Sequence, residues 1–347
     1  MKAAVVQKDG RSIKVQEVSD PEVEPGELLL KTIYCSICGT DLEYLDGVLA
    51  NVPGFEPYSG TILGHEWVAE VVALGEGVQG WSVGDRAAYC SAKRTCGVCY
   101  FCRRGLYHLC VGGLSRGSAF GTESFGKRMG TMAEYFLRMP NLAQPVAENL
   151  SSEEACLAEP LASGIGSVRA SGAGFGDSVV IIGAGKIGLG AMLCARAAGV
   201  APVIIIDINE RRLKKALELG ADIVLNPNDT DVVNEVVRVT DAGPDAVLIC
   251  VREGKVLNQA VQMVRRGGTI VLTGFVSPMG IDPALWVEKQ LTVRGSWSGP
   301  VTAALNLMAH SIVDVRPLIT HILPLEDVQK GIDLVRSGEG LGVLLKP

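Results

Sequence analysis

Short apolar runs alternate with segments of helical periodicity between residues 179 and 293, and this alternation constrains the fold more than any other feature. The apolar runs are Val179–Ile182, Val203–Ile206, Ile223–Leu225, Ala246–Val251, Thr269–Leu272 and Leu291–Val293. Strands that are apolar throughout are typical of a parallel sheet covered on both faces. The helical segments between them are Ile187–Ala198, Glu210–Leu219, Asp231–Val239 and Leu257–Val264. The sequence therefore predicts an α/β domain built on a doubly wound parallel sheet.

The first of these runs leads into a glycine-rich turn. Residues 183–188 read Gly-Ala-Gly-Lys-Ile-Gly, which has the G-x-G-x-x-G spacing and opens a helix. In this context Gly183 makes the tight turn, Gly185 lets a pyrophosphate approach the backbone at the helix N-terminus, and Gly188 allows the helix to pack closely on the strand. An acidic residue, Asp207, ends the next strand about 20 residues further on, where it would bind a ribose 2′-hydroxyl. We therefore expect a dinucleotide-binding domain.

The charges beside this turn bear on the choice of dinucleotide. The Asp207 carboxylate would repel a 2′-phosphate, which predicts NAD rather than NADP. Arg211 and Arg212 follow closely and would either offset part of that repulsion or lie as solvated charges on a helix. The residues that we expect at the cofactor are Gly183, Gly185, Lys186, Ile187, Gly188, Asp207 and Arg212.

Four of the ten cysteines lie in one short segment with the spacing C-x2-C-x2-C-x7-C: Cys96, Cys99, Cys102 and Cys110. Four thiolates in one lobe match a closed tetrahedral zinc site of the structural kind. We find no signal-peptide core and no apolar run of about 18 residues, so we expect a cytoplasmic protein. In the cytosol disulfides are rare, and clustered cysteines more often bind metal. The sequence therefore predicts a zinc lobe over about residues 90–112.

The remaining composition excludes several classes of protein. Hydrophobic residues make up 48% and charged residues 20%, which argues against a disordered chain. A net charge of −6 and an aromatic content of 5% argue against a binder of nucleic acid or of membrane surfaces. Residues 1–150 contain short apolar pieces separated by Gly and Pro, which indicates a β-rich domain. Ser151 and Glu154 form a capping-box pattern that predicts a helix start.

Further motifs occur in a fixed order along the chain. They are Cys38-Gly39-Thr40-Asp41, Gly64-His65-Glu66, the four-cysteine lobe, Glu159-Pro160-Leu161 and the glycine-rich turn. In this order and spacing the chain resembles the zinc-dependent medium-chain dehydrogenase/reductase family over essentially its whole length. Glu159-Pro160-Leu161 and Arg294-Gly295-Ser296-Trp297 make it most similar to the sorbitol and galactitol-phosphate polyol dehydrogenase group. The resemblance implies a GroES-like catalytic domain (1–155 and 298–347) with an inserted Rossmann NAD-binding domain (156–297).

The residue types also fit a catalytic zinc site, which needs few protein ligands and one open position. Cys38 and His65 supply a thiolate and an imidazole. The resemblance implies that Glu66 or Glu159 completes the ligand set. It also implies that the two glutamates exchange as zinc ligands when the occupant of the open coordination position changes. Asp41 would lie behind the ligands and fix His65.

The resemblance also assigns the proton transfer. It implies that Thr40 accepts the proton of the alcohol. Many relatives have a histidine two residues after the aspartate of this motif, and it ends the proton relay to solvent. Glu43 stands at that place in this chain. Either its carboxylate takes protons or the relay ends in water at the cofactor ribose.

These parts predict an oxidoreductase with two zinc ions per chain that transfers hydride between NAD and a secondary alcohol of a polyol or sugar derivative. An activity like that of L-threonine 3-dehydrogenase is an alternative, because Cys38–Asp41 occurs there too. Relatives of that type tend to have Asp-Pro in place of Glu159-Pro160. A non-catalytic protein that binds zinc and nucleotide is a third alternative, which the retained catalytic motifs disfavour. The resemblance implies a homodimer or homotetramer, with the strand at 291–295 as a candidate pairing edge.

Overall fold

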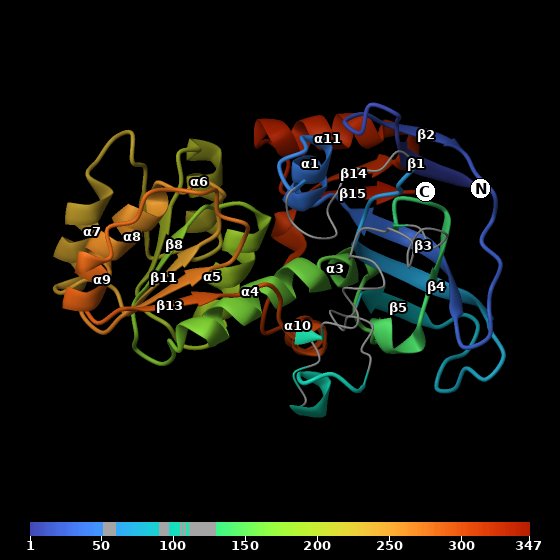
Figure 1. Cartoon of the computed structure of the whole chain (residues 1–347), viewed down its shortest axis with the longest axis horizontal. Coiled ribbons are helices and arrows are strands. Elements are labelled where there is room, and N and C mark those ends of the chain that lie inside the picture. The colour runs from blue at the N-terminus through green and yellow to red at the C-terminus, as the bar shows by residue number, and fades with distance from the viewer. Residues whose placement is uncertain (51–59, 90–96, 105, 107–108, 111–129) are drawn as a thin grey trace. The chain divides into compact units, whose positions relative to one another are not determined.

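The computed structural model of the chain describes residues 1–50, 60–89, 97–104, 106, 109–110 and 130–347. It divides into two compact units (Figure 1), Met1–Glu159 with Leu318–Pro347, and Pro160–Pro317. Residues 298–317 thus cluster with the second unit, whereas the sequence-based boundary placed them in the first. Close packing explains the difference. A Cβ atom on Gly299 would lie 2.0 Å from the carbonyl oxygen of Ala162, so the segment fits tightly against the helix that contains Ala162.

The second unit is built on a six-stranded sheet with the order β10-β9-β8-β11-β12-β13, and every pair is parallel. The strands are β8 (Val179–Ile182), β9 (Val203–Ile206), β10 (Ile223–Leu225), β11 (Ala246–Ile249), β12 (Thr269–Leu272) and β13 (Thr292–Gly295). The chain runs outward from β8 to β10 and then returns to β11 on the other side of β8. This confirms the predicted doubly wound sheet. Ligands of such sheets bind beyond the carboxyl ends of the strands at this switch point.

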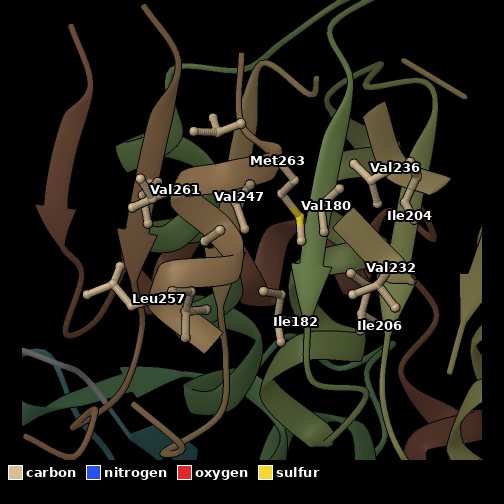
Figure 2. Close-up of a cluster of buried hydrophobic side chains, with 14 of the residues drawn as sticks. Val180, Ile182, Ile204, Ile206, Val232, Val236, Val247, Leu257, Val261 and Met263 are labelled. Carbon is tan, nitrogen blue, oxygen red and sulfur yellow. The ribbon is translucent and has the colours of Figure 1, made fainter. Parts of the chain in front are cut away.

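Helices cover both faces of this sheet, which explains why its strands are apolar throughout. The helices are α4 (Ala158–Ser171), α5 (Lys186–Ala197), α6 (Glu210–Glu218), α7 (Val232–Thr240), α8 (Val256–Met263), α9 (Ala284–Glu288) and α10 (Val301–Ala309). On one face, Val180 and Val247 of the strands pack with Val236 of α7 and Leu257 of α8 (Figure 2). Among the described residues, no helix is both long enough and apolar enough to cross a bilayer.

The first unit is β-rich, as predicted. Strands β1 (Lys2–Val6) and β2 (Ile13–Glu17) form an antiparallel pair. A seven-stranded sheet has the order β14-β15-β3-β4-β5-β7, with β6 paired to β3. Its strands are β3 (Leu28–Ser36), β4 (Glu66–Leu74), β5 (Arg86–Tyr89), β6 (Tyr135–Arg138), β7 (Ala143–Pro145), β14 (Ile319–Pro324) and β15 (Gly342–Lys346).

Short helices complete the first unit. They are α1 (Gly39–Leu45), α3 (Ser152–Cys156) and α11 (Val328–Ser337), with 3-10 turns η1 (Cys102–Arg104), η3 (Pro140–Leu142) and η5 (Leu325–Asp327), and η4 (Arg316–Leu318) at the boundary. The predicted capping box starts α3. The N–H of Glu154 donates to Ser151 Oγ at 3.3 Å, and the N–H of Ser151 donates to the Glu154 carboxylate at 3.2 Å.

Candidate functional site

The antiparallel register of β3 on β4 brings two distant motifs together. Ser36 at the end of β3 pairs with Glu66 at the start of β4. Cys38 follows β3 by two residues and His65 immediately precedes β4, so both lie at the same end of this pair. The turn before His65 requires glycine. Gly64 has φ +99°, and a Cβ atom there would lie 2.9 Å from the backbone nitrogen of Met132.

Cys38, His65 and Glu66 form a compact cluster of metal-ligating groups. One ligand atom from each lies within 4.8 Å of the others. Cys38 is buried and Glu66 is completely buried. A thiolate, an imidazole and a carboxylate are the donors that zinc takes in proteins, so the residues present fit this ion. Glu159, the other expected carboxylate, lies in the first turn of α4 and is not part of this group among the described residues.

Asp41 connects two of these groups from helix α1. Its Oδ2 accepts a hydrogen bond of 2.9 Å from the N–H of Cys38, because Cys38 is the N-cap of the helix and Asp41 is its third residue. Its Oδ1 lies 3.7 Å from His65 Nδ1. Asp41 is fully buried. One carboxylate therefore holds the backbone of Cys38 and faces the ring of His65, which is the geometry expected of a group behind the ligands.

The electric field of this cluster favours positive charge. Burial lowers the pKa of His65, but the negative charge of Cys38 in its thiolate form and the Asp41 carboxylate outweigh burial and raise that pKa well above its ordinary value. A divalent cation would meet the same field, and it would take the place of the proton on a coordinating nitrogen. The electrostatics and the donor set thus agree on a cation site.

Thr40 and Glu43 share one side of helix α1 next to this cluster. The Cys38 thiol donates to Thr40 Oγ1 at 3.6 Å. Glu43 lies three residues after Thr40, a spacing that places both side chains on the same helix face. Both are half-buried, whereas Asp41, Leu42 and Tyr44 are buried. The helix therefore directs a hydroxyl and then a carboxylate along its partly exposed side.

The cysteine lobe shows a second convergence of ligands. Ligand atoms of Cys99, Cys102 and Cys110 lie within 4.8 Å of one another. The Cys99 sulfur is 3.5 Å from that of Cys102 and 4.0 Å from that of Cys110. The described cysteines form no disulfide. Cys96, the fourth expected ligand, lies outside the described residues. The three described thiols are placed as a zinc site requires.

The glycine-rich turn after β8 has two glycines that the fold demands and one that faces open space. A Cβ atom on Gly183, which has φ +106°, would lie 2.6 Å from Val251 Cγ1. A Cβ atom on Gly188 would lie 1.8 Å from the carbonyl oxygen of Gly183. In contrast, the nearest atom to a Cβ on Gly185 is Nη1 of Arg212, at 3.9 Å. The open space in front of Gly185 therefore suits a phosphate group at the start of α5.

Asp207 and Arg212 place opposite charges beside this turn. Asp207 Oδ2 accepts a hydrogen bond of 2.6 Å from the N–H of Ala184, and its Oδ1 accepts one of 2.8 Å from the N–H of Asn209. A carboxylate has further acceptor positions, so Asp207 keeps capacity for ribose hydroxyls. Lys186 and Ile187 begin α5 at this turn, with Gly185 as its N-cap. The predicted cofactor residues therefore lie together.

Sequence reasoning missed two residues that support the glycine-rich turn and its neighbour Asp207. Val251 supports Gly183 from the end of β11, and Asn209 caps α6 next to Asp207. Only the strand order places the end of β11 beside β8, so the sequence carried no signal for Val251. The signal for Asn209 was present, because Asn one residue before a helical segment is a typical N-cap.

Comparisons with known proteins agree with this geometry. Residues 24–147 match the family model of the alcohol dehydrogenase GroES-like domain, and residues 187–311 match that of zinc-binding dehydrogenases. L-threonine 3-dehydrogenase of Pyrococcus furiosus is 36% identical, with 93% of this chain and 92% of that protein covered. Sorbitol dehydrogenase of Bacillus subtilis is 30% identical, with 100% and 97% covered.

A solved structure also matches over the full length. It is a zinc-binding dehydrogenase from Sinorhizobium meliloti 1021 bound to NADP, with a TM-score of 0.88, 28% identity and coverage of 100% of this chain and 99% of that one. Both domain models, the near-complete coverage of curated relatives and the full-length structural match point the same way. The chain belongs to the zinc-dependent medium-chain dehydrogenase family.

Proposed function

We propose that this protein is an NAD-dependent dehydrogenase that oxidises a secondary alcohol of a polyol or sugar derivative. The observation that carries the proposal is the buried cluster of Cys38, His65 and Glu66, at the end of β3 and the start of β4. Membership of a family of zinc-dependent alcohol oxidoreductases supports it.

In this proposal, different residues of the chain bind the zinc and orient its ligands. Cys38, His65 and Glu66 would hold the catalytic zinc, with Glu159 as the alternative carboxylate. Bound there, zinc supplies the Lewis acidity that lowers the pKa of an alcohol hydroxyl, while the nicotinamide accepts the hydride. Asp41 keeps the His65 ring oriented through its buried carboxylate.

The proton of the alcohol needs a route of its own. Thr40 Oγ1 would accept the hydroxyl proton and pass its own proton on. The proton then reaches either the Glu43 carboxylate or water at the cofactor ribose. The common side of α1 that Thr40 and Glu43 share supports the first route without excluding the second.

The cysteine lobe would hold the second zinc, with Cys96, Cys99, Cys102 and Cys110 as ligands. A site closed by four thiolates has no open position for a substrate, so its contribution is to the folding of the lobe. The convergence of three thiols within 4.8 Å supports this part of the proposal.

We expect the protein to prefer NAD over NADP because Asp207 would repel a 2′-phosphate. The similar structure from Sinorhizobium meliloti is bound to NADP, so similarity alone does not predict a preference for NAD. The prediction rests on Asp207 of this chain. Like charges brought together cost several kcal/mol, so kcat/KM with NAD should exceed that with NADP by at least about tenfold. Asp207→Asn keeps the shape of the side chain and should bring the kcat/KM values for NAD and NADP closer together. Arg211→Ala should lower kcat/KM with NADP if Arg211 offsets the repulsion, and should leave both values unchanged if Arg211 is a solvated charge. Wild-type kcat/KM values that favour NADP would contradict the assignment.

The substrate is best tested by the appearance of NADH across a panel of polyols, sugar acids, sugar phosphates, L-threonine and simple alcohols. We expect the highest kcat/KM with a polyol or a sugar derivative. L-threonine is the second candidate, because the curated relative from Pyrococcus is 36% identical. A maximum at L-threonine would replace the first candidate with the second. Absence of NADH formation with every compound, in protein that carries zinc and binds NAD, would refute the catalytic proposal.

The proposal includes a homodimer or homotetramer. Among the residues that the structure describes, strand β13 pairs with β12 alone, so its other edge is available for pairing. Three of its four residues are exposed. An open edge of this kind is a template for a strand of a second copy.

A further inference from the structure

Helix α3 contacts β3 and β4, and three of the residues from α3 to the start of α4 are spaced three apart. These residues, Glu153, Cys156 and Glu159, run from α3 into the first turn of α4. Leu157, which separates the two helices, has φ −89° and ψ 8°, so the backbone stays close to helical. Residues three apart on a helix lie on the same face. We call these three residues the α3–α4 row.

The first two members of the row are hydrogen-bonded to the two strands. The hydroxyl of Tyr34 on β3 donates to Glu153 Oε1 at 2.9 Å. The thiol of Cys156, which is completely buried, donates to the carbonyl oxygen of Glu66 on β4 at 3.7 Å. Burial and the neighbouring carboxylate raise the pKa of Tyr34 to about 12, so the hydroxyl keeps the proton that it donates. The two bonds hold α3 along the β3–β4 pair.

The register of the strands gives the direction in which the row runs. Tyr34 pairs with Val68, two residues further into β4 than Glu66, its first residue. The step from the first contact of the row to the second therefore leads toward the end of the pair that carries the zinc-ligand cluster. Glu159 is the next member, and three residues span at most about 11 Å. It is half-buried and belongs to the same compact unit as the cluster.

We propose that Tyr34 and Cys156 are positioning residues, which hold the α3–α4 row so that the Glu159 carboxylate can reach the catalytic zinc. This inference rests on the proposed function, in which Glu159 is the alternative carboxylate to Glu66. It adds residues to which none of the zinc motifs points. Because the Cys156 thiol ties the row to the backbone of Glu66 itself, the two carboxylates can exchange at the ion by side-chain movement while the helix stays in place.

Tyr34→Phe tests the first contact, because it removes one hydroxyl and keeps the ring. Loss of a group behind a metal ligand typically costs 10–100-fold in activity or metal affinity. We therefore expect kcat to fall about tenfold and zinc to pass to a chromophoric chelator about tenfold faster than from wild type. The catalytic zinc is identified as the ion whose release is missing in Cys38→Ser. The NADH dissociation constant should change by less than about twofold.

A double-mutant cycle with Glu159→Gln separates positioning from a general structural role. Glu159→Gln alone should lower kcat and speed the release of the catalytic zinc by about tenfold or more. If Tyr34 acts through Glu159, adding Tyr34→Phe to Glu159→Gln should change either quantity by less than about twofold. A structural role independent of Glu159 would instead multiply the two effects, to about 100-fold in the double variant.

Tyr135→Phe is the matched control for loss of a phenol hydroxyl. Tyr135 lies on β6 and pairs with Lys31, five residues before the end of β3 at which the cluster lies, so we expect wild-type kcat and zinc release. Cys156→Val tests the second contact, and Cys156→Ser, which keeps a donor, should lie closer to wild type. Thermal melts report the fold of each variant, and the Cys156 pair decides the matter if Tyr34→Phe does not fold.

The outcomes separate this inference from the proposed function. Wild-type kcat and zinc release in both Tyr34→Phe and Cys156→Val would overturn the inference, and so would effects that multiply with those of Glu159→Gln. Wild-type behaviour of Glu159→Gln would overturn it as well, while a loss of activity in Cys38→Ser would still support the proposed function. If wild type holds no zinc at Cys38 and forms no NADH with any alcohol, the proposed function fails and the inference fails with it.

Discussion

Cys38→Ser is expected to remove nearly all dehydrogenase activity. Cys38 is the only sulfur in the cluster with His65 and Glu66, and a serine hydroxyl is a poor replacement for a zinc-binding thiolate. The Lewis acidity of a bound metal contributes several kcal/mol to the transition state, and each 1.36 kcal/mol is tenfold in rate, so kcat should fall on the order of 10³-fold. Steady-state kinetics measures the loss. Metal analysis should show about one zinc per chain in the variant, held by the cysteine lobe, against two in wild type.

Cys35→Ser is the matched control for this experiment. Cys35 lies three residues earlier on β3, and its Sγ is 3.2 Å from Thr131 Oγ1. Burial raises the pKa of the Cys35 thiol to about 12, so it stays protonated and packs without binding a metal. Serine retains the hydrogen bond to Thr131, and we expect wild-type kcat and two zinc ions. Full activity in Cys38→Ser, or an equal loss in both variants, would contradict the proposed ligand role of Cys38.

The parallel sheet could be predicted from the sequence because strands buried on both faces are apolar throughout. Both faces are covered by helices, so Val180 and Ile181 are equally buried although they point to opposite sides. The predicted bounds of these strands therefore agree with the observed bounds to within two residues. The last strand begins at Thr292, one residue after the predicted Leu291. Local signals such as the Ser151–Glu154 capping box could also be predicted, because they depend on residues close in sequence.

The features that could not be predicted from the sequence depend on contacts between residues far apart in the chain. The motifs around Cys38 and His65 indicated zinc chemistry, but only the register of Ser36 on Glu66 shows how two segments so far apart in sequence meet. The domain boundary depends on similar information. The apolar pattern of Val301–Ala309 fits a helix in either unit, and the tight contact of Gly299 with Ala162 decides which unit receives it.

Two substitutions in the glycine-rich turn should have different effects, one on stability and the other on cofactor binding. Gly188→Ala should destabilise the protein, because its Cβ atom would lie 1.8 Å from the carbonyl oxygen of Gly183 and the turn cannot retreat without strain at Gly183, where φ is +106°. Overpacking of this kind costs about 1–3 kcal/mol or more. The melting temperature should fall by about 2 °C or more. Thermal unfolding without ligand measures this effect.

Gly185→Ala should leave stability unchanged and weaken the cofactor instead. Gly185 has φ −75°, which alanine adopts freely, and the nearest atom to its Cβ would be Arg212 Nη1 at 3.9 Å. The added methyl group would occupy the space that we assign to the pyrophosphate, so the NADH dissociation constant should rise at least about tenfold, since a displacement near 1 Å in a binding site costs on the order of 10²-fold. Calorimetric titration measures it. An unchanged NADH affinity in Gly185→Ala would show that the pyrophosphate does not lie against this turn. If Gly188→Ala melts at the wild-type temperature, the close approach of Gly188 to the carbonyl oxygen of Gly183 is not needed for the stability of the fold.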